Sequence, residues 1–193
     1  MYPMIRFAKD MARARRAPRL APLQAHVSTH RCWPWDLDPW MELNNGRTLT
    51  LYDLGRIPMA VRIGLTDTLK ANGWGITVAG NTVRYRRRIR PFQRFTQVSR
   101  VIGWDRRFLY MEQSLWSLGE CCNQILLRVA VVRGDQRSGM VPPAEAMAAM
   151  GMHDPSPDLP AWVEAWIAAE AIRPWPPALP PIGPADRTPD LPA

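Results

Sequence analysis

The chain has 193 residues, of which 47% are hydrophobic, and its 25 lysines and arginines against 17 acids give a formal net charge of +8. This length suits one domain of ordinary size with tails, and no apolar run approaches the ~18 residues that a membrane-spanning helix needs. The excess of arginine favours an anionic partner, whether a phosphorylated small molecule, an acidic lipid or nucleic acid.

Residues 1–24 form a basic N-terminal segment. Its first 20 residues hold six cations against one acid, Asp10, and Met4, Phe7 and Met11 recur at helical spacing. Such a helix suits peripheral contact with an anionic membrane or a transit signal, and it equally suits a solvated basic end. The sequence leaves these alternatives open.

Residues 25–150 show the order strand, helix, then several strands. The segment 29–35 predicts a first strand, and a helix bent at Pro58 follows, with Thr66 as the cap of a second, short helix. Later strands are separated at turn residues near 80, 90, 105 and 119, and 125–132 is apolar on both faces, as in a central strand. This order predicts an α+β layer in which an antiparallel sheet covers one helix, and its free edges favour a homodimer or a dimer of dimers.

Residues 151–193 form the C-terminal part, which holds eleven of the 20 prolines. The segment 160–172 predicts a short helix that we expect to pack on the domain. The proline-rich tail after it suits either a disordered end or a ligand for aromatic-lined peptide-binding grooves.

The cysteine and histidine positions give no expectation of a metal site. Cys32, Cys121 and Cys122 do not complete a disulfide framework or a zinc site. His26 and His30 are four residues apart, but their neighbours predict a strand, which favours a structural role for both. Reduced thiols indicate a reducing compartment, so we expect a cytoplasmic protein, with peripheral membrane contact through residues 1–20 as an addition.

The segment "DLDPWMELNNGRTLTLYDLGR", residues 36–56, places acids and amides just ahead of the long helix. Counting from Asp38, Asn44 and Asn45 follow at six and seven residues, Asp53 at fifteen and Arg56 at eighteen. This spacing resembles the 4-hydroxybenzoyl-CoA-thioesterase-like pattern of hotdog-fold thioesterases. Together with "YRRRIRPFQRF" and "GWDRRFLYMEQSLW", it is similar to the thioesterase-superfamily-member-6-like branch.

The resemblance covers about residues 26–145, and it implies the hotdog fold, with an antiparallel sheet wrapped around one long helix. The C-terminal helix predicted over 160–172 is an addition to this fold, because neither tail takes part in the resemblance. It implies an acyl-CoA thioesterase of lipid metabolism that needs no cofactor besides the coenzyme A moiety of its substrate. Two positions depart from the pattern: the family's frequent Gly-His is here Met41-Glu42, and a common tyrosine is here Thr48.

Asp38 is the candidate nucleophile or general base for thioester hydrolysis. Backbone N–H groups at the start of the helix, around Asn45, Gly46 and Arg47, would hold the oxyanion. The side-chain amide of Asn44 or Asn45 would hold the loop or position the thioester. The alternative for Asp38 is a helix cap, and capping is favoured for both asparagines. Asp36 is interpreted as a loop-structuring acid, and Asp53 with Arg56 as an ion pair.

Three further features extend the candidate site. Glu42 is a possible second carboxylate, which would either raise the pKa of Asp38 or mark a site that binds thioesters without cleaving them. Trp33, Trp35 and Trp40 flank the acidic loop, where they wall an acyl pocket or pack in the core. The predicted phosphate-binding residues for coenzyme A, or otherwise a solvated strand face, are Arg84, Arg86 and Arg88.

The predicted function is acyl-CoA thioester hydrolysis, and the alternative is a non-catalytic acyl-thioester or lipid-binding protein. Nucleic acid is not an expected partner, because the basic segment around residues 83–95 lacks a recognisable binding motif.

Overall fold

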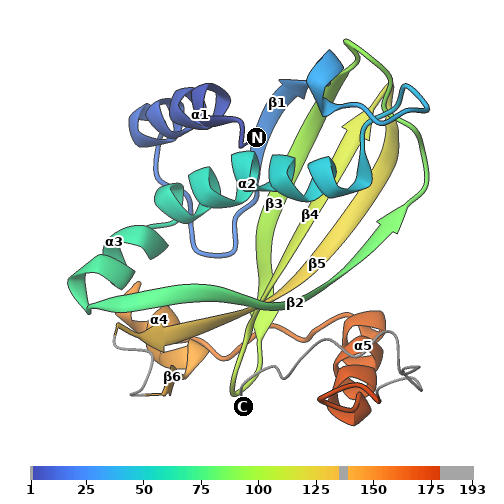
Figure 1. Ribbon diagram of the computed structural model, residues 1–193. Helices are drawn as coiled ribbons and strands as arrows, with labels where there is room; N and C mark the ends of the chain where they lie inside the picture. The colour runs from blue at the N-terminus through green and yellow to red at the C-terminus, as the bar shows by residue number, and fades with distance from the viewer. Residues whose placement is uncertain (1, 135–138, 179–193) are drawn as a thin grey trace, which may run out of the picture. The chain divides into compact units, whose positions relative to one another are not determined.

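The computed structural model describes residues 2–134 and 139–178 (Figure 1). The chain divides into two compact units, Met1–Asp158 and Leu159–Ala193. In the first unit the elements are, in chain order, α1 (Met4–Arg16), β1 (His26–Arg31), the 3₁₀ helix η1 (Pro34–Asp36), α2 (Asn45–Arg62), α3 (Leu65–Ala71), β2 (Trp74–Tyr85), β3 (Arg94–Trp104), β4 (Leu109–Ser117), β5 (Glu120–Arg133), β6 (Met140–Val141) and α4 (Pro143–Ala149).

The second unit contains α5 (Ala161–Ile172), which confirms the helix predicted over 160–172. The part of the proline-rich tail from residue 179 onward lies outside the described residues. Nowhere in residues 2–134 and 139–178 is a helix both long enough and apolar enough to span a bilayer.

The sheet of the first unit is antiparallel and has the strand order β1-β3-β4-β5-β2, with β6 paired to β5. Helix α2 lies across one face of this sheet, and α1 lies beside α2 (Figure 1). Strand β5 sits between two neighbours and buries both of its faces, as its apolar sequence predicts. The α+β layer predicted from the sequence is therefore confirmed.

Some predicted boundaries were wrong for local reasons. The first strand ends at Arg31, because Pro34 starts the turn η1. The short helix α3 follows Gly64, which adopts a φ of +85°, so Thr66 lies inside the helix and does not cap it. Strand β2 continues through Gly80 with only a shift of register where a break was predicted.

Strand β2 also ends earlier than the alternating arginines suggest. The N–H groups of Arg86 and Arg87 both donate to the carbonyl oxygen of Cys122, at 2.8 and 2.9 Å. Two consecutive N–H groups that point to one acceptor cannot continue the alternation of a strand. Of the three predicted phosphate-binding arginines, only Arg84 therefore lies on a strand.

Helix α2 packs closely on the sheet at a polar contact within the apolar core. The carbonyl oxygen of Tyr52 accepts hydrogen bonds from Gln97 Nε2 at 2.8 Å and Gln113 Nε2 at 2.9 Å. A Cβ atom at Gly55 would clash with the side chains of Gln97 and Ser99, so the glycine allows α2 to approach the sheet without displacing them. The contact fixes α2, and with it the loop that precedes it, against β3 and β4.

Candidate functional site

The acidic loop ahead of α2 is a short hairpin. Leu37 and Leu43 form an antiparallel bridge, and the N–H of Asn44 donates to the carbonyl oxygen of Asp36 at 3.0 Å. Between them Met41 adopts a φ of +57°, in the left-handed region that favours glycine. This conformation accounts for the glycine that the hotdog pattern frequently has at this position.

Asp38 holds the tip of this hairpin. Its Oδ1 accepts hydrogen bonds from the N–H groups of Trp40 at 2.9 Å and Glu42 at 3.3 Å. Its Oδ2 has no hydrogen-bond partner within the part of the chain that the structure describes, and the side chain is half-buried. One carboxylate oxygen of Asp38 therefore fixes the loop, and the other makes no hydrogen bond with the described residues.

The first turn of α2 is capped on one side only. Asn44 Oδ1 accepts a hydrogen bond from the N–H of Arg47 at 2.9 Å, which confirms the capping role predicted for Asn44. The same prediction for Asn45 was wrong, because Asn45 is the first residue of the helix. The N–H groups of Asn45 and Gly46 have no acceptor among the described residues. Two donors thus remain at the positive end of the helix dipole.

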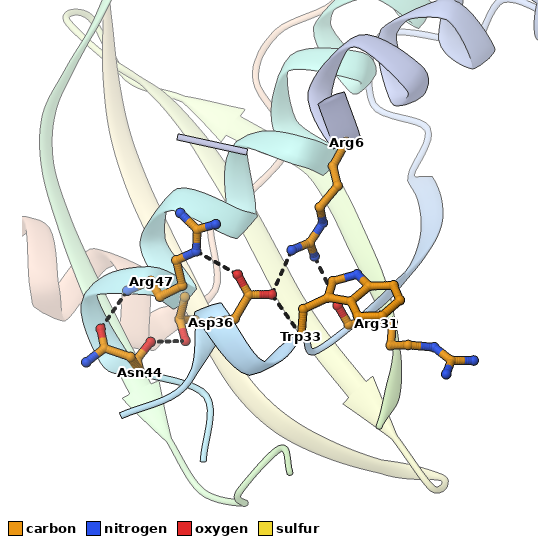
Figure 2. A network of polar contacts seen from close by, with 7 residues as sticks. Arg6, Arg31, Trp33, Asp36, Asn44 and Arg47 are labelled. Atoms are coloured by element: carbon orange, nitrogen blue, oxygen red, sulfur yellow. Dashed lines mark hydrogen bonds and ion pairs between the residues drawn. The ribbon is translucent and has the colours of Figure 1, made fainter. Parts of the chain in front are cut away.

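Asp36, two residues before Asp38, is fully buried and ion-paired on both oxygens (Figure 2). Its Oδ2 lies 2.7 Å from an Nη atom of Arg6, and its Oδ1 lies 2.7 Å from Nε of Arg47. The N–H of Trp33 also donates to Oδ2 at 3.1 Å. The loop-structuring role predicted for Asp36 is confirmed, but its partner in α1 was not foreseen.

A large apolar cavity of about 1170 Å³ opens next to this network. It is lined by α1 and the residues just before it, by the η1 segment, and by the start of α2. The lining residues are Tyr2, Pro3, Met4, Ile5, Arg6, Trp33, Trp35, Asp36, Leu37, Asn44, Gly46, Arg47 and Thr50. Trp33 and Trp35 stack with their ring centroids 5.4 Å apart, whereas Trp40 is exposed and does not line the cavity.

A second, cationic hollow lies beside the same helix end; we call it the arginine groove. It consists of two adjoining cavities of about 580 and 210 Å³ that share Tyr85, Arg86, Arg87 and Asn123. Arg84 lines the larger cavity, and Arg88 lines the smaller one together with Glu42 and Asn45. The structure therefore brings the three predicted arginines to one groove, although they do not share a strand face.

Polar contacts tie this groove to the acidic loop and to α2. Glu42 Oε2 lies 2.7 Å from Nε of Arg88, so the second carboxylate is paired with a cation. The hydroxyl of Tyr85 donates to the carbonyl oxygen of Asn45 at 3.1 Å, and burial raises the pKa of that phenol. Asp38 lines neither the groove nor the apolar cavity, but its Oδ1 accepts from Glu42, which does line the groove.

The contribution of the N-terminal helix was missed from the sequence. The hydroxyl of Tyr2 donates to Asp53 of α2 at 3.4 Å, and burial together with Asp53 raises the pKa of Tyr2 to about 12. Asp53 also forms the predicted ion pair with Arg56. The signal in the sequence was Asp10, the single acid within this basic segment. In the structure Asp10 is buried, so the segment packs against the rest of the unit.

Comparison with known proteins identifies relatives of this arrangement. The family model described as thioesterase-like superfamily matches residues 32–167. Protein THEM6 of Xenopus laevis is 32% identical over 119 residues, which are 61% of this chain and 58% of that protein. Protein THEM6 of Danio rerio is 31% identical over 105 residues, which are 53% of this chain and 52% of that protein. The chain thus spans little more than half the length of these relatives.

Solved structures agree in fold. A proposed oleoyl thioesterase from Lactobacillus plantarum superposes with a TM-score of 0.60 at 18% identity, over 72% of this chain and 56% of that one. A thioesterase from Thermus thermophilus, in complex with coenzyme A and zinc, gives 0.53 at 24% identity, over 69% and 99% of the two chains. The predicted hotdog thioesterase fold is confirmed.

Proposed function

Since this chain belongs to the thioesterase-like superfamily, we propose that it hydrolyses the thioester of an acyl-CoA at the N-terminus of α2. The observation that carries the proposal is that this helix end borders two unlike cavities. Gly46 and Arg47 line the apolar cavity, and Asn45 lines the arginine groove. An acyl-CoA has matching ends, an apolar acyl chain and a phosphorylated nucleotide, with the thioester and the pantetheine arm between them.

The coenzyme A moiety would lie in the arginine groove. Guanidinium groups bind phosphate oxygens through paired N–H donors, and Arg84, Arg86 and Arg88 present three of them. Glu42 holds Arg88 in place. In this arrangement Glu42 orients a phosphate-binding side chain and is not a second catalytic acid.

The thioester carbonyl would lie against the first turn of α2. The free N–H groups of Asn45 and Gly46 support an oxyanion site, because the charge that develops on the carbonyl oxygen needs donors already in position. The absence of a side chain at Gly46 allows a substrate to approach the backbone.

Asp38, rather than Asp36, is the proposed reacting carboxylate. Both oxygens of Asp36 are in ion pairs, whereas Oδ2 of Asp38 has no partner among the residues that the structure describes. As a nucleophile, Oδ2 attacks the carbonyl carbon and the carbon–sulfur bond breaks, which leaves a mixed anhydride on Asp38 that water then hydrolyses, while the departing thiolate takes a proton from water. As a general base, Oδ2 takes a proton from the water that attacks the carbonyl carbon and gives it to the departing thiolate as the carbon–sulfur bond breaks. Water supplies the oxygen of the product acid.

The Asp38→Asn variant tests this role. Asparagine keeps the oxygen that accepts from Trp40 and Glu42, so the loop stays folded, but it loses the reactive charge. We expect acyl-CoA turnover, measured as free-thiol release, to fall by about a hundredfold or more. The exposed Asp67→Asn variant, which removes the same charge on α3, should keep wild-type turnover. Unchanged turnover in Asp38→Asn would contradict the mechanism.

A non-catalytic acyl-thioester or lipid-binding protein is the second candidate. It is favoured by the loop itself, because Asp36 and Glu42 are both ion-paired and the histidine frequent in the hotdog pattern is absent. This function predicts saturable binding of acyl-CoA, measured by calorimetry, with no release of thiol at any chain length tested.

A further inference from the structure

One wall of the apolar cavity is formed by the start of α1 and the residues just before it. This segment lies outside the part of the chain that the family model matches. Residues 2–6 line the cavity, whereas the family match begins at residue 32. The shape of the cavity therefore depends on residues that lie outside the family match.

Buried contacts hold this wall in a fixed position. Arg6 of α1 pairs with the fully buried Asp36 at 2.7 Å and donates a second hydrogen bond to the carbonyl oxygen of Arg31 at 3.1 Å (Figure 2). Asp36 in turn pairs with Arg47 in the first turn of α2. One buried carboxylate thus links the wall to the proposed oxyanion site, so the cavity is already formed before a ligand enters.

The chemistry of the cavity suits a hydrocarbon. Two stacked tryptophans form one side, and Met4 and Ile5 face the solvent with 63% and 87% of their surface exposed. Among the described residues that line the cavity, Asp36 is the one carboxylate, and both of its oxygens are in ion pairs. A polar ligand would meet few partners there, whereas an apolar chain would remove exposed apolar surface from water.

Size and position indicate which apolar ligand this is. At about 1170 Å³ the cavity is at or above the usual range of roughly 300–1,000 Å³ for small-molecule sites. It also adjoins Gly46 and Arg47, where the proposed thioester lies. We infer that residues 2–6 form one wall of an acyl-chain site and that the substrates are long-chain acyl thioesters. The inference rests on the proposed function for the position of the thioester.

The test is a series of butyryl-, octanoyl- and palmitoyl-CoA assayed by thiol release, with each acyl-CoA kept below its micelle concentration. For the wild type, kcat/KM should rise by up to about fourfold for each methylene group that enters the cavity. Ile5→Asp places a charge on the wall and should lower kcat/KM for palmitoyl-CoA by about tenfold or more, with butyryl-CoA unaffected. The matched control is Ala8→Asp, which puts the same charge on an exposed position of α1 outside the cavity.

The inference would be overturned, with hydrolysis itself intact, if the ratio of kcat/KM for palmitoyl-CoA to kcat/KM for butyryl-CoA were equal in the wild type, Ile5→Asp and Ala8→Asp. The inference would also be overturned if Ile5→Asp left the kcat/KM values unchanged and reduced only the sedimentation of the protein with vesicles of phosphatidylcholine and phosphatidylglycerol. The exposed side chains of residues 2–6 would then contact a membrane surface and not an acyl chain. If no thioester is cleaved, the proposed function fails, and calorimetry decides the inference. Palmitoyl-CoA must then bind more tightly than butyryl-CoA, and Ile5→Asp but not Ala8→Asp must remove the difference.

Discussion

Asp36 connects two helices that are far apart in the sequence through a single side chain. Its partners are largely buried as well, since the side chains of Arg6 and Arg47 are each 14% exposed. Removing one member of such a group leaves the remaining charges without compensation in a poorly solvated place, and this costs more than the intact group contributes.

We therefore expect Asp36→Asn to lower the free energy of unfolding by about 3 kcal/mol or more, as measured by urea denaturation. The comparison is Asp67→Asn, which removes an acid from an ion pair with Arg19 whose two side chains are about two-thirds exposed. That variant should lower the free energy of unfolding by less than about 1 kcal/mol, because solvent screens the pair. Similar small losses in both variants would show that Asp36 is not the structural link described here.

Contacts between residues that are close in the sequence could be predicted, and contacts between distant residues could not. The cap at Asn44 and the pair of Asp53 with Arg56 follow from local spacing along a helix, and both were predicted. The link between Asp36 and Arg6 crosses 30 positions of the chain, and no local pattern indicates it. The three arginines were assigned to a common site, but on a strand face that ends at Tyr85.

At the scale of elements, α1 contacts β1 through a buried polar cluster. His30 Nε2 lies 2.8 Å from Oγ of Ser28, and His30 Nδ1 lies 3.6 Å from Oδ2 of the buried Asp10. Burial, with nearby cations of α1, lowers the pKa of His30 to about 3. Burial and the neighbouring Arg62 lower the pKa of His26 to about 4. Both rings are therefore neutral in the folded protein at neutral pH.

These pKa values predict that the protein loses stability in mild acid. Below about pH 6.5 the unfolded chain binds protons at His26 and His30 that the folded chain does not bind, so the free energy of unfolding falls with pH. Between about pH 7 and about pH 5 the loss should be about 2 kcal/mol for each histidine. Asp10, whose pKa burial raises, has the opposite sign and offsets part of the loss toward lower pH.

Urea denaturation at the two pH values measures this loss. In His30→Gln the difference in the free energy of unfolding between the two pH values should be smaller by the contribution of one histidine, about 2 kcal/mol. In His153→Gln, which changes an exposed histidine, the difference should stay as in the wild type. A difference that is the same in wild type and both variants would show that the buried rings do not control the acid response. The sequence suggested a structural role for His26 and His30, but only the packing of α1 reveals why they stay neutral.

At the scale of the whole molecule, the free edge of the sheet at β2 favours a second copy of the chain. Within the part of the chain that the structure describes, strand β2 has a single strand partner, β5, and Ile76 and Val78 on it are more than 40% exposed. A long edge strand with exposed apolar side chains tends to pair with another edge, and two identical edges pair about a twofold axis. We propose a homodimer, or a dimer of dimers, that joins two sheets at β2.

Light scattering should then give at least twice the mass of one chain. Ile76→Lys brings like charges together across the proposed twofold axis and should shift the mass toward the monomer. Val27→Lys is the matched control, because it changes an exposed residue of β1 at the opposite edge of the same sheet. A monomeric wild type, or equal effects of both substitutions, would contradict the proposal.

The position of Tyr2 has a practical consequence for biochemical work. Tyr2 forms part of the rim where α1 meets the hydrocarbon-lined opening, and its hydroxyl is anchored to Asp53. A purification peptide fused ahead of it would start next to that opening, where it would compete for space with the acyl chain that we infer to bind there. Protein intended for ligand measurements should therefore carry its affinity handle after residue 193, or have the leading handle removed by a protease beforehand.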